Sequence, residues 1–264
     1  MWDLVERFIL TPVGYVGRRT LAVVRSLGRM GLFLAQALGC AVLPPLKIFR
    51  VLQQIKFIGF GSLLVIVLTG SFTGMVLGFQ GHNTLTRVGA KAFLGPMVAI
   101  SLLRELGPVM TALMVTGRAG SAMTAHLGIM RITEQIDELE ILGLSPQRYL
   151  VVPNLLAALI SVPLLTAVFN VVGIFGGYLV GGELLGVNAG TYFGSMSDYV
   201  VPNDALIGLY KSFAFGGIIA WVCCYKGFHC RFGAEGVSHA TTQAVVLSSV
   251  LILGCDYVLT SFLF

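Results

Sequence analysis

The sequence predicts an all-α integral membrane protein, in which an N-terminal interfacial or elbow segment precedes five transmembrane helices. Two observations support this fold class. The 264 residues are 56% hydrophobic and only 11% charged, whereas about a quarter of the residues of a soluble domain are charged. The apolar residues also gather in five runs, each close to the 20 or so residues that a spanning helix needs. We expect a single transmembrane domain over 1–264, with the interfacial region at 1–56 and the membrane core at 57–264.

The first region, residues 1–56, is expected to lie along the membrane surface. Its run 30–46 is apolar but shorter than a span, and it ends at Pro44-Pro45. Proline cannot continue a helix without the loss of a hydrogen bond. We interpret residues 1–50 as an amphipathic interfacial segment with an elbow. The sequence leaves open whether 30–46 lies on the surface or inserts partly.

Each of the five apolar runs predicts one spanning helix. Their approximate boundaries are 57–82, 95–118, 149–182, 206–226 and 243–264. The third run is longer than a bilayer requires, so it can tilt, break near Pro163 or extend outside the membrane. In the first run, Gly70, Gly74 and Gly78 recur at a spacing that lets helix backbones approach closely in lipid. That spacing fits packing inside one chain and packing between two copies equally well.

Basic residues predict the orientation of the spans. With 1–56 on the cytoplasmic side, the inside segments hold 13 of the 17 Lys and Arg residues, which is the excess that cytoplasmic loops carry. The outside loop 183–205 has three acidic residues, Asp204 among them, and no Lys or Arg, while Arg87 and Lys91 in the first outside loop depart from the rule. The net charge of +5 therefore marks cytoplasmic loops and does not indicate nucleic-acid binding.

The segment between the second and third runs, residues 118–153, is too polar to cross a membrane. It has an apolar stripe at helical spacing, formed by Ile129, Ile132, Ile136 and Leu139. Acidic side chains lie on or beside the other faces of the same predicted helix: Glu134, Asp137, Glu138 and Glu140. A membrane protein that presents such a helix on one side has a docking element for a soluble partner.

Four ionisable residues fall inside the predicted spans: Arg104, Glu105, Lys211 and Asp256. A charge at the bilayer centre costs at least ~2.5 kcal/mol and is normally paired. At about 1.5 Å of rise per residue, Lys211 and Asp256 lie at comparable depth, so we expect an ion pair between them. Arg104 and Glu105 are neighbours whose side chains diverge on a helix, so at least one needs a partner on another helix. These charges either fix helix register or line a polar cavity for an amphiphilic substrate.

Motifs for catalysis are missing from the sequence. There is no GxxxxGK[ST] loop, no HExxH and no GxSxG, so the sequence predicts no catalytic residue, no metal site and no ATP hydrolysis by this chain. Its four histidines are scattered, and its five cysteines lack metal-ligand spacing.

Several short motifs occur in order and resemble the MlaE family of permeases, also called YrbE-type, from about residue 50 onward. They are Arg104-Glu105-Leu106-Gly107-Pro108-Val109, Thr116-Gly117-Arg118-Ala119-Gly120-Ser121, Glu134-Gln135-Ile136-Asp137-Glu138-Leu139-Glu140, Leu142-Gly143 and Pro153-Asn154. The resemblance implies the membrane subunit of an ABC transporter that moves phospholipid between the bacterial inner membrane and the outer membrane and maintains outer-membrane lipid asymmetry.

The resemblance also implies the partners. The family forms homodimers, binds a cytoplasmic ABC ATPase that uses ATP, and works with a periplasmic protein of the mammalian-cell-entry (MCE) type, in some systems with a STAS-domain protein. The charge distribution, with five spans, places the N-terminus in the cytoplasm and the C-terminus in the periplasm. The acid-rich segment resembles a coupling helix, with contributions from Arg131, Glu134, Asp137, Glu138, Glu140 and Gly143. Leu139 and Glu140 stand where other ABC importers have alanines.

Two other functions compete with this interpretation. A stand-alone proton-coupled secondary transporter would use Glu105 or Asp256 as its proton site, but five spans do not divide evenly into the inverted repeats typical of that class. An intramembrane lipid enzyme would need a nucleophile or metal cluster near one interface, and the sequence has none. We therefore expect Arg104, Glu105, Lys211 and Asp256 to bind substrate in a transporter subunit that is not an enzyme.

Overall fold

A computed structural model of the chain describes residues 11–42 and 48–263, and all regular secondary structure within them is helical. The chain divides into two compact units, Met1–Leu46 and Lys47–Phe264. In the first unit, α2 (Thr11–Val42) is one helix of 32 residues. Residues 30–42, the described part of the apolar run 30–46, continue the same helix, and Pro44 and Pro45 lie outside the described residues.

The second unit contains five helices long and apolar enough to cross a membrane, which confirms the predicted number. They span Ile48–Arg87, Lys91–Ile132, Gln147–Leu184, Pro202–Phe228 and Ala234–Leu263. The first of these helices begins at Ile48, nine residues before the approximate start that the sequence predicts for the membrane core. The fifth begins at Ala234 and not at 243, because the polar residues before 243 form its first turns.

Each of the first three spanning helices is built from several segments. The first comprises α3 (Ile48–Ile55), η2 (Lys56–Phe60) and α4 (Gly61–Arg87). The second comprises η3 (Lys91–Phe93), α5 (Leu94–Ser101), η4 (Leu102–Leu106), α6 (Gly107–Val115), η5 (Thr116–Gly120) and α7 (Ser121–Ile132). The third comprises η6 (Gln147–Val151), α9 (Val152–Tyr178) and η7 (Leu179–Leu184). All of the η segments except η3 are π-helical turns, which are wider than α-helical turns and often occur at functional sites. Pro163 lies inside α9 without ending it.

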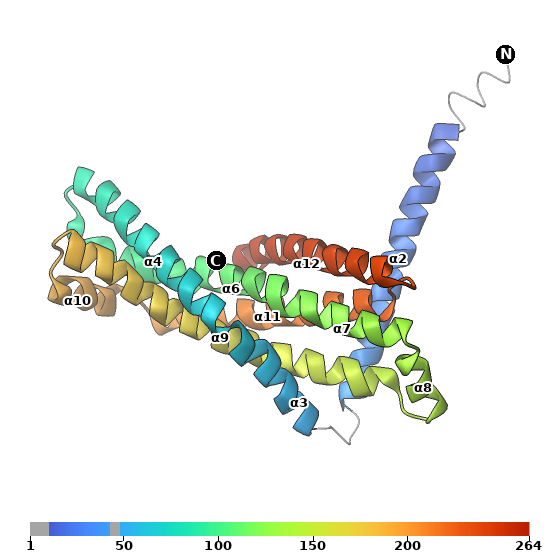
Figure 1. The fold of residues 1–264 in the computed structure, drawn as a ribbon. Coiled ribbons are helices and arrows are strands. Elements are labelled where there is room, and N and C mark those ends of the chain that lie inside the picture. Colours follow the sequence, from blue (N-terminus) through green and yellow to red (C-terminus); the bar gives the residue numbers. More distant parts are fainter. Residues whose placement is uncertain (1–10, 43–47, 264) are drawn as a thin grey trace, which may run out of the picture. The chain divides into compact units, whose positions relative to one another are not determined.

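Short helices lie in two of the connections between spans. α8 (Gln135–Ile141) links the second span to the third, and α10 (Ala189–Tyr199) links the third to α11 (Pro202–Phe228), the fourth span. Figure 1 shows α8 and α10 at opposite ends of the membrane unit. α9 packs against both α4 and α11, and α11 also packs against α12 (Ala234–Leu263) and α7. This arrangement makes α9 and α11 the central helices of the unit.

The glycines of the first span form a close contact with α9. A Cβ on Gly78 would lie 2.6 Å from the carbonyl oxygen of Gly177, and a Cβ on Gly74 would overlap the carbonyl group of Gly173. Gly70 faces Phe169 in the same way, since a Cβ there would lie 3.1 Å from the Phe169 carbonyl oxygen. The structure thus places the contact of Gly70, Gly74 and Gly78 inside one chain, so these residues are not free for the alternative contact between two copies.

Candidate functional site

The four ionisable residues predicted within the spans come together where the second, fourth and fifth spanning helices meet. η4 carries Arg104 and Glu105, α11 carries Lys211, and α12 carries Asp256. The expected pair is confirmed, since Lys211 Nζ lies 3.0 Å from Asp256 Oδ1. We call these four residues, with Asp204 and Thr260, the charged junction.

Lys211 is the centre of the charged junction. Its Nζ lies 2.6 Å from Glu105 Oε2 and donates a hydrogen bond of 2.8 Å to Thr260 Oγ1. The side chain is 0% exposed. An ammonium group taken out of water loses several kcal/mol of hydration unless opposite charge and hydrogen bonds replace it, on the order of the buried-ion penalty in proteins. Two carboxylates and a hydroxyl group, drawn from two other helices, provide that replacement.

Arg104 has a different partner, which the sequence interpretation missed. Its Nε donates a hydrogen bond of 2.7 Å to Asp204 Oδ1. Asp204 was expected in an outside loop; instead it lies in the first turn of α11, with its side chain 2% exposed. Its other oxygen accepts a bond of 3.1 Å from the backbone N–H of Val201, so the carboxylate also caps the helix. Both neighbours on η4 therefore find partners on α11, whereas the sequence required a partner on another helix for at least one of them.

The backbone explains why η4 and α11 lie close enough for these pairs. Gly208 of α11 stands between Asp204 and Lys211, and a Cβ there would overlap the carbonyl oxygen of Leu103. Positions 204 and 211 are seven residues apart, so they lie on one face about two turns from each other. The contact at Gly208 presents that face to the wide turn that carries Arg104 and Glu105.

The charged junction is closed on one side and open on the other. Lys211 is completely buried, but the side chains of Arg104 and Glu105 are 33% and 38% exposed. The junction has two cationic and three anionic side chains. Charged groups at membrane depth normally face protein or water and not lipid tails. The open side therefore needs a polar or charged occupant, or protein that covers it.

The acid-rich segment differs from its prediction. The sequence predicted one amphipathic helix, but α7 ends at Ile132 and α8 begins at Gln135. Glu134 between them has the left-handed conformation, with φ of 60°. An ion pair of 2.5 Å between Arg131 and Asp137 joins the two sides of this turn. All six predicted coupling residues thus lie in or around a sharp turn and a short helix.

The predicted apolar stripe is only partly buried. Ile136 is 0% exposed, as expected for the inner face, whereas Ile129 is 51% exposed. The apolar residues at the tip of α8 are exposed instead: Ile141 by 85% and Leu142 by 72%. Gly143 follows with φ of +72°, a conformation that favours glycine, and its N–H bonds to the carbonyl of Glu140 to end the helix.

The surface of α8 therefore combines charge and apolar area. Glu134, Glu138 and Glu140 are exposed beside Ile141 and Leu142. We call these five residues the α8 surface. Exposed apolar residues rimmed by charge are typical of a protein-binding surface.

Two residues of the charged junction, Asp204 and Thr260, were not predicted as site residues. Thr260 follows Asp256 by four residues and Asp204 precedes Lys211 by seven, so both spacings place the missed residue on the helical face of a predicted one. That spacing was the available signal. Among residues 11–42 and 48–263, no group of three or more His, Cys, Asp or Glu side chains is arranged to hold a metal ion.

Comparison with known proteins finds matches over most of the chain. Residues 51–262 match the family model described as "Permease MlaE". Over 259 residues the chain is 41% identical to the intermembrane phospholipid transport system permease protein MlaE of Haemophilus influenzae, covering 97% of this chain and 98% of that protein. It is 41% identical over 256 residues to a probable ABC transporter permease protein of Rickettsia bellii, covering 97% and 99%. It is also 38% identical over 213 residues to the chloroplastic protein TRIGALACTOSYLDIACYLGLYCEROL 1 of Arabidopsis thaliana, covering 81% of this chain and 61% of that protein.

Proposed function

This chain belongs to the MlaE permease family, and we propose that it is the membrane subunit of an ABC-type transporter that moves phospholipid between the inner membrane and the outer membrane, and so maintains outer-membrane lipid asymmetry. The chain is a multi-pass membrane protein and a transporter subunit, not an enzyme. ATP is hydrolysed by a partner ATPase. The N-terminus faces the cytoplasm and the C-terminus the periplasm, as the distribution of basic residues indicates.

The open side of the charged junction is the observation that carries the substrate assignment. Arg104, Glu105, Lys211 and Asp256 form the polar part of a phospholipid site in the membrane. A phospholipid has a charged head and two apolar tails, so its site needs a few polar groups in an apolar wall. The junction has that composition: charged side chains from three helices within a membrane unit made of apolar helices.

The roles within the site follow from exposure. Arg104 is a third exposed while it holds Asp204, so its guanidinium can add a phosphate to its partners, and guanidinium geometry matches phosphate. Lys211 is buried beneath Glu105 and does not reach the open side. Lys211 and Asp256 therefore position Glu105, and Arg104 and Glu105 contact the lipid.

A second copy of the chain completes the site. The family resemblance implies a homodimer, and a half-open charged cluster at membrane depth is the surface that such a partner would enclose. The glycines of the first span are not available for this contact because α9 covers them.

The α8 surface is the coupling element. The ATPase binds there, on the cytoplasmic side, and its movements reach the charged junction through α7, which continues the helix that carries Arg104 and Glu105. α10 lies at the other end of the unit, on the side where a periplasmic MCE-type protein would bind (Figure 1). A STAS-domain protein would bind the ATPase.

The test has two parts. Purification of the tagged chain from its native membrane should recover an ABC ATPase, and vesicles that contain the complex should move phospholipid only with ATP. Arg104→Ala and Glu105→Ala should lower the phospholipid that co-purifies with the complex, while Arg87→Ala, a matched change of a basic residue outside the junction, should not. ATP-independent movement driven by a proton gradient would instead favour a secondary transporter.

A further inference from the structure

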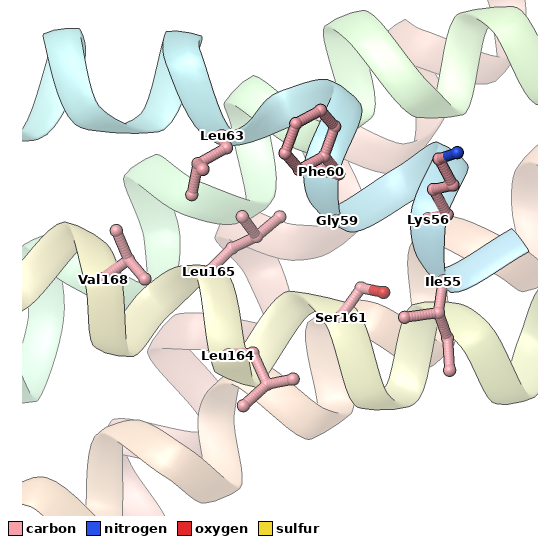
Figure 2. Close-up of a pocket in the computed structure, with 9 residues that line it drawn as sticks. All are labelled: Ile55, Lys56, Gly59, Phe60, Leu63, Ser161, Leu164, Leu165 and Val168. Atoms are coloured by element: carbon pink, nitrogen blue, oxygen red, sulfur yellow. The ribbon is translucent and has the colours of Figure 1, made fainter. Parts of the chain in front are cut away.

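A groove on the flank of the membrane unit lies apart from the charged junction. η2 and the start of α4 form one wall, and α9 forms the other. The groove has a volume of about 310 Å³ and is lined by Ile55, Lys56, Gly59, Phe60, Leu63, Ser161, Leu164, Leu165 and Val168. Figure 2 shows Lys56 and Ile55 at one end and Leu63 and Val168 at the other. We propose that this groove binds one acyl chain of a membrane phospholipid whose phosphate is held by Lys56.

The location and lining of the groove argue for an acyl chain. Both walls belong to helices that are long and apolar enough to cross a membrane, which favours lipid tails as the neighbours of the groove. Apart from Lys56 and Ser161, every lining side chain is apolar, and the rim residues Phe60 and Leu164 are 74% and 60% exposed. The volume is at the lower end of ligand pockets, which start at about 300 Å³, so it suits one chain and not a whole lipid.

The polar groups occur where a phospholipid has its own polar groups. Lys56 is exposed at the end of the groove, next to the apolar run of the first span, and has no ion-pair partner among the described residues. A lysine at such a boundary extends its ammonium group to the level of the lipid phosphates. An anionic phosphate at this position therefore has a cation opposite it, while the chain continues along Leu63, Leu165 and Val168.

Ser161 is the second indication of a ligand. It is 1% exposed, yet within the described part of the chain its hydroxyl has no hydrogen-bond partner. The buried hydroxyls of Thr116 and Thr166 donate to the carbonyl four residues before them, whereas those of Ser62 and Thr111, which do not line the groove, lack a partner as Ser161 does. A buried hydroxyl without a partner is unfavourable, by about 1–3 kcal/mol for such groups in general. The ester carbonyl of a phospholipid lies between phosphate and acyl chain, and it is the acceptor that Ser161 lacks.

Gly59 keeps the groove open. Its Cα faces Ser161, and a Cβ at this position would lie 3.5 Å from Ser161 Oγ, at ordinary contact distance. Any larger side chain would fill the space between the two walls. The groove therefore exists because Gly59 in the wide turn η2 and Ser161 on α9 are both small.

The test uses the complete complex in nanodiscs of dioleoylphosphatidylcholine with a trace of phosphatidylglycerol that carries a diazirine in its acyl chain. After illumination, mass spectrometry of peptides should find adducts on Leu63, Leu165 and Val168. Lys56→Gln should reduce these adducts about fivefold, the effect of one basic residue at an anionic lipid surface. Ser161→Ala should reduce them about two- to tenfold, the range for one hydrogen bond.

A matched pair of tryptophan variants separates the groove from the general lipid-facing surface. Leu164→Trp fills the groove, whereas Leu64→Trp adds the same bulk at a position that is 71% exposed and does not line it. Only Leu164→Trp should abolish the adducts. The proposal is overturned if the groove stays unlabelled in the unaltered chain, which would mean that protein fills it, or if Leu164→Trp and Leu64→Trp give equal labelling. The readout needs neither ATP nor transport, so it does not depend on the proposed function.

Discussion

Two contacts between spanning helices in this molecule use opposite kinds of residue: one uses glycines and the other uses charged side chains. Along α4 and α9, glycines bring two backbones together, and the groups that face them are backbone carbonyls and the ring of Phe169. Where η4, α11 and α12 meet, five charged side chains and a threonine join three helices. The three glycines of the first contact are buried. The second contact is open on one side, since the side chains of Arg104 and Glu105 are 33% and 38% exposed.

The difference suggests how stability and function are divided in the membrane unit. Glycine contacts gain van der Waals packing at every turn and have no alternative arrangement of similar energy. The partly exposed ions of the charged junction can have alternative partners, because an added phosphate or carboxylate can pair with them. We therefore expect changes at the glycine contact to affect folding alone, and changes at the charged junction to affect folding and lipid binding to different degrees.

The largest effect on stability is expected for Lys211→Met. The change removes the buried cation that contacts both Glu105 and Asp256 and leaves two carboxylates, which are 38% and 21% exposed, without that partner. Removal of one partner from a fully buried pair costs about 3–5 kcal/mol, and the partial exposure of the two carboxylates lowers the expected loss below that range. The measurement is the unfolding temperature of the purified protein in detergent.

A double-mutant cycle provides the control for this first prediction. Asp256→Asn alone should be milder, because Lys211 keeps Glu105, and Lys211→Met with Asp256→Asn should be less than additive. Strict additivity would show that the two residues do not interact.

The next largest effect tests the glycine contact. Gly74→Ala places a Cβ onto the carbonyl group of Gly173, and such overpacking costs about 1–3 kcal/mol. Gly254→Ala on α12 is the matched control, since nothing lies within 4 Å of its Cβ position. There the better helix propensity of alanine should stabilise the protein by up to about 1 kcal/mol. In thermal unfolding, Gly74→Ala should lower the unfolding temperature and Gly254→Ala should raise it. Changes of the same sign in the two variants would contradict the contact.

The sequence predicts the composition of both contacts but not their partners. The GxxxG spacing identifies Gly70, Gly74 and Gly78 as contact residues, yet the same spacing serves one chain or two, so only the structure could place them against α9. Depth along the helices predicts the pair of Lys211 and Asp256. It could not find Asp204, because the first turn of α11 looks like loop sequence until Pro202 is recognised as the helix start.

The N-terminal and acid-rich regions show a second limit. Periodicity predicts a single helix through Ile129 and Leu139, because it detects apolar spacing and not backbone conformation. The left-handed turn at Glu134 has no glycine or asparagine to indicate it. Likewise α2 continues through the region where a short apolar run suggested an elbow.

A smaller effect is expected for Thr260→Val, which keeps the shape of the side chain and removes its hydroxyl. The hydroxyl accepts from Lys211 at 2.8 Å and donates to the backbone carbonyl of Asp256 at 2.8 Å. One such bond contributes about 0.5–1.5 kcal/mol, so the free energy of unfolding should fall by that amount. If the junction binds lipid, the phospholipid recovered with the complex should fall several-fold while the protein stays folded. Thr260→Ser restores the hydroxyl and should restore the lipid. A loss of stability without a loss of lipid would assign the residue to folding alone.

The smallest effect on stability is expected at the α8 surface, which belongs to neither contact. Glu138 and Glu140 are exposed, and exposed substitutions usually change stability by less than about 0.5 kcal/mol. The double charge reversal Glu138→Lys with Glu140→Lys should nevertheless abolish ATPase binding, because it replaces two anions that face the ATPase with two cations. The matched control is Glu183→Lys, in the last turn of the third span, with Asp198→Lys in α10; it changes the net charge by the same amount at the other end of the unit. Co-purification of the ATPase and ATP-driven lipid movement are the measurements. If the α8 variant keeps both, the ATPase binds elsewhere. If the α10-side control loses both as well, net charge and not the α8 surface determines the association.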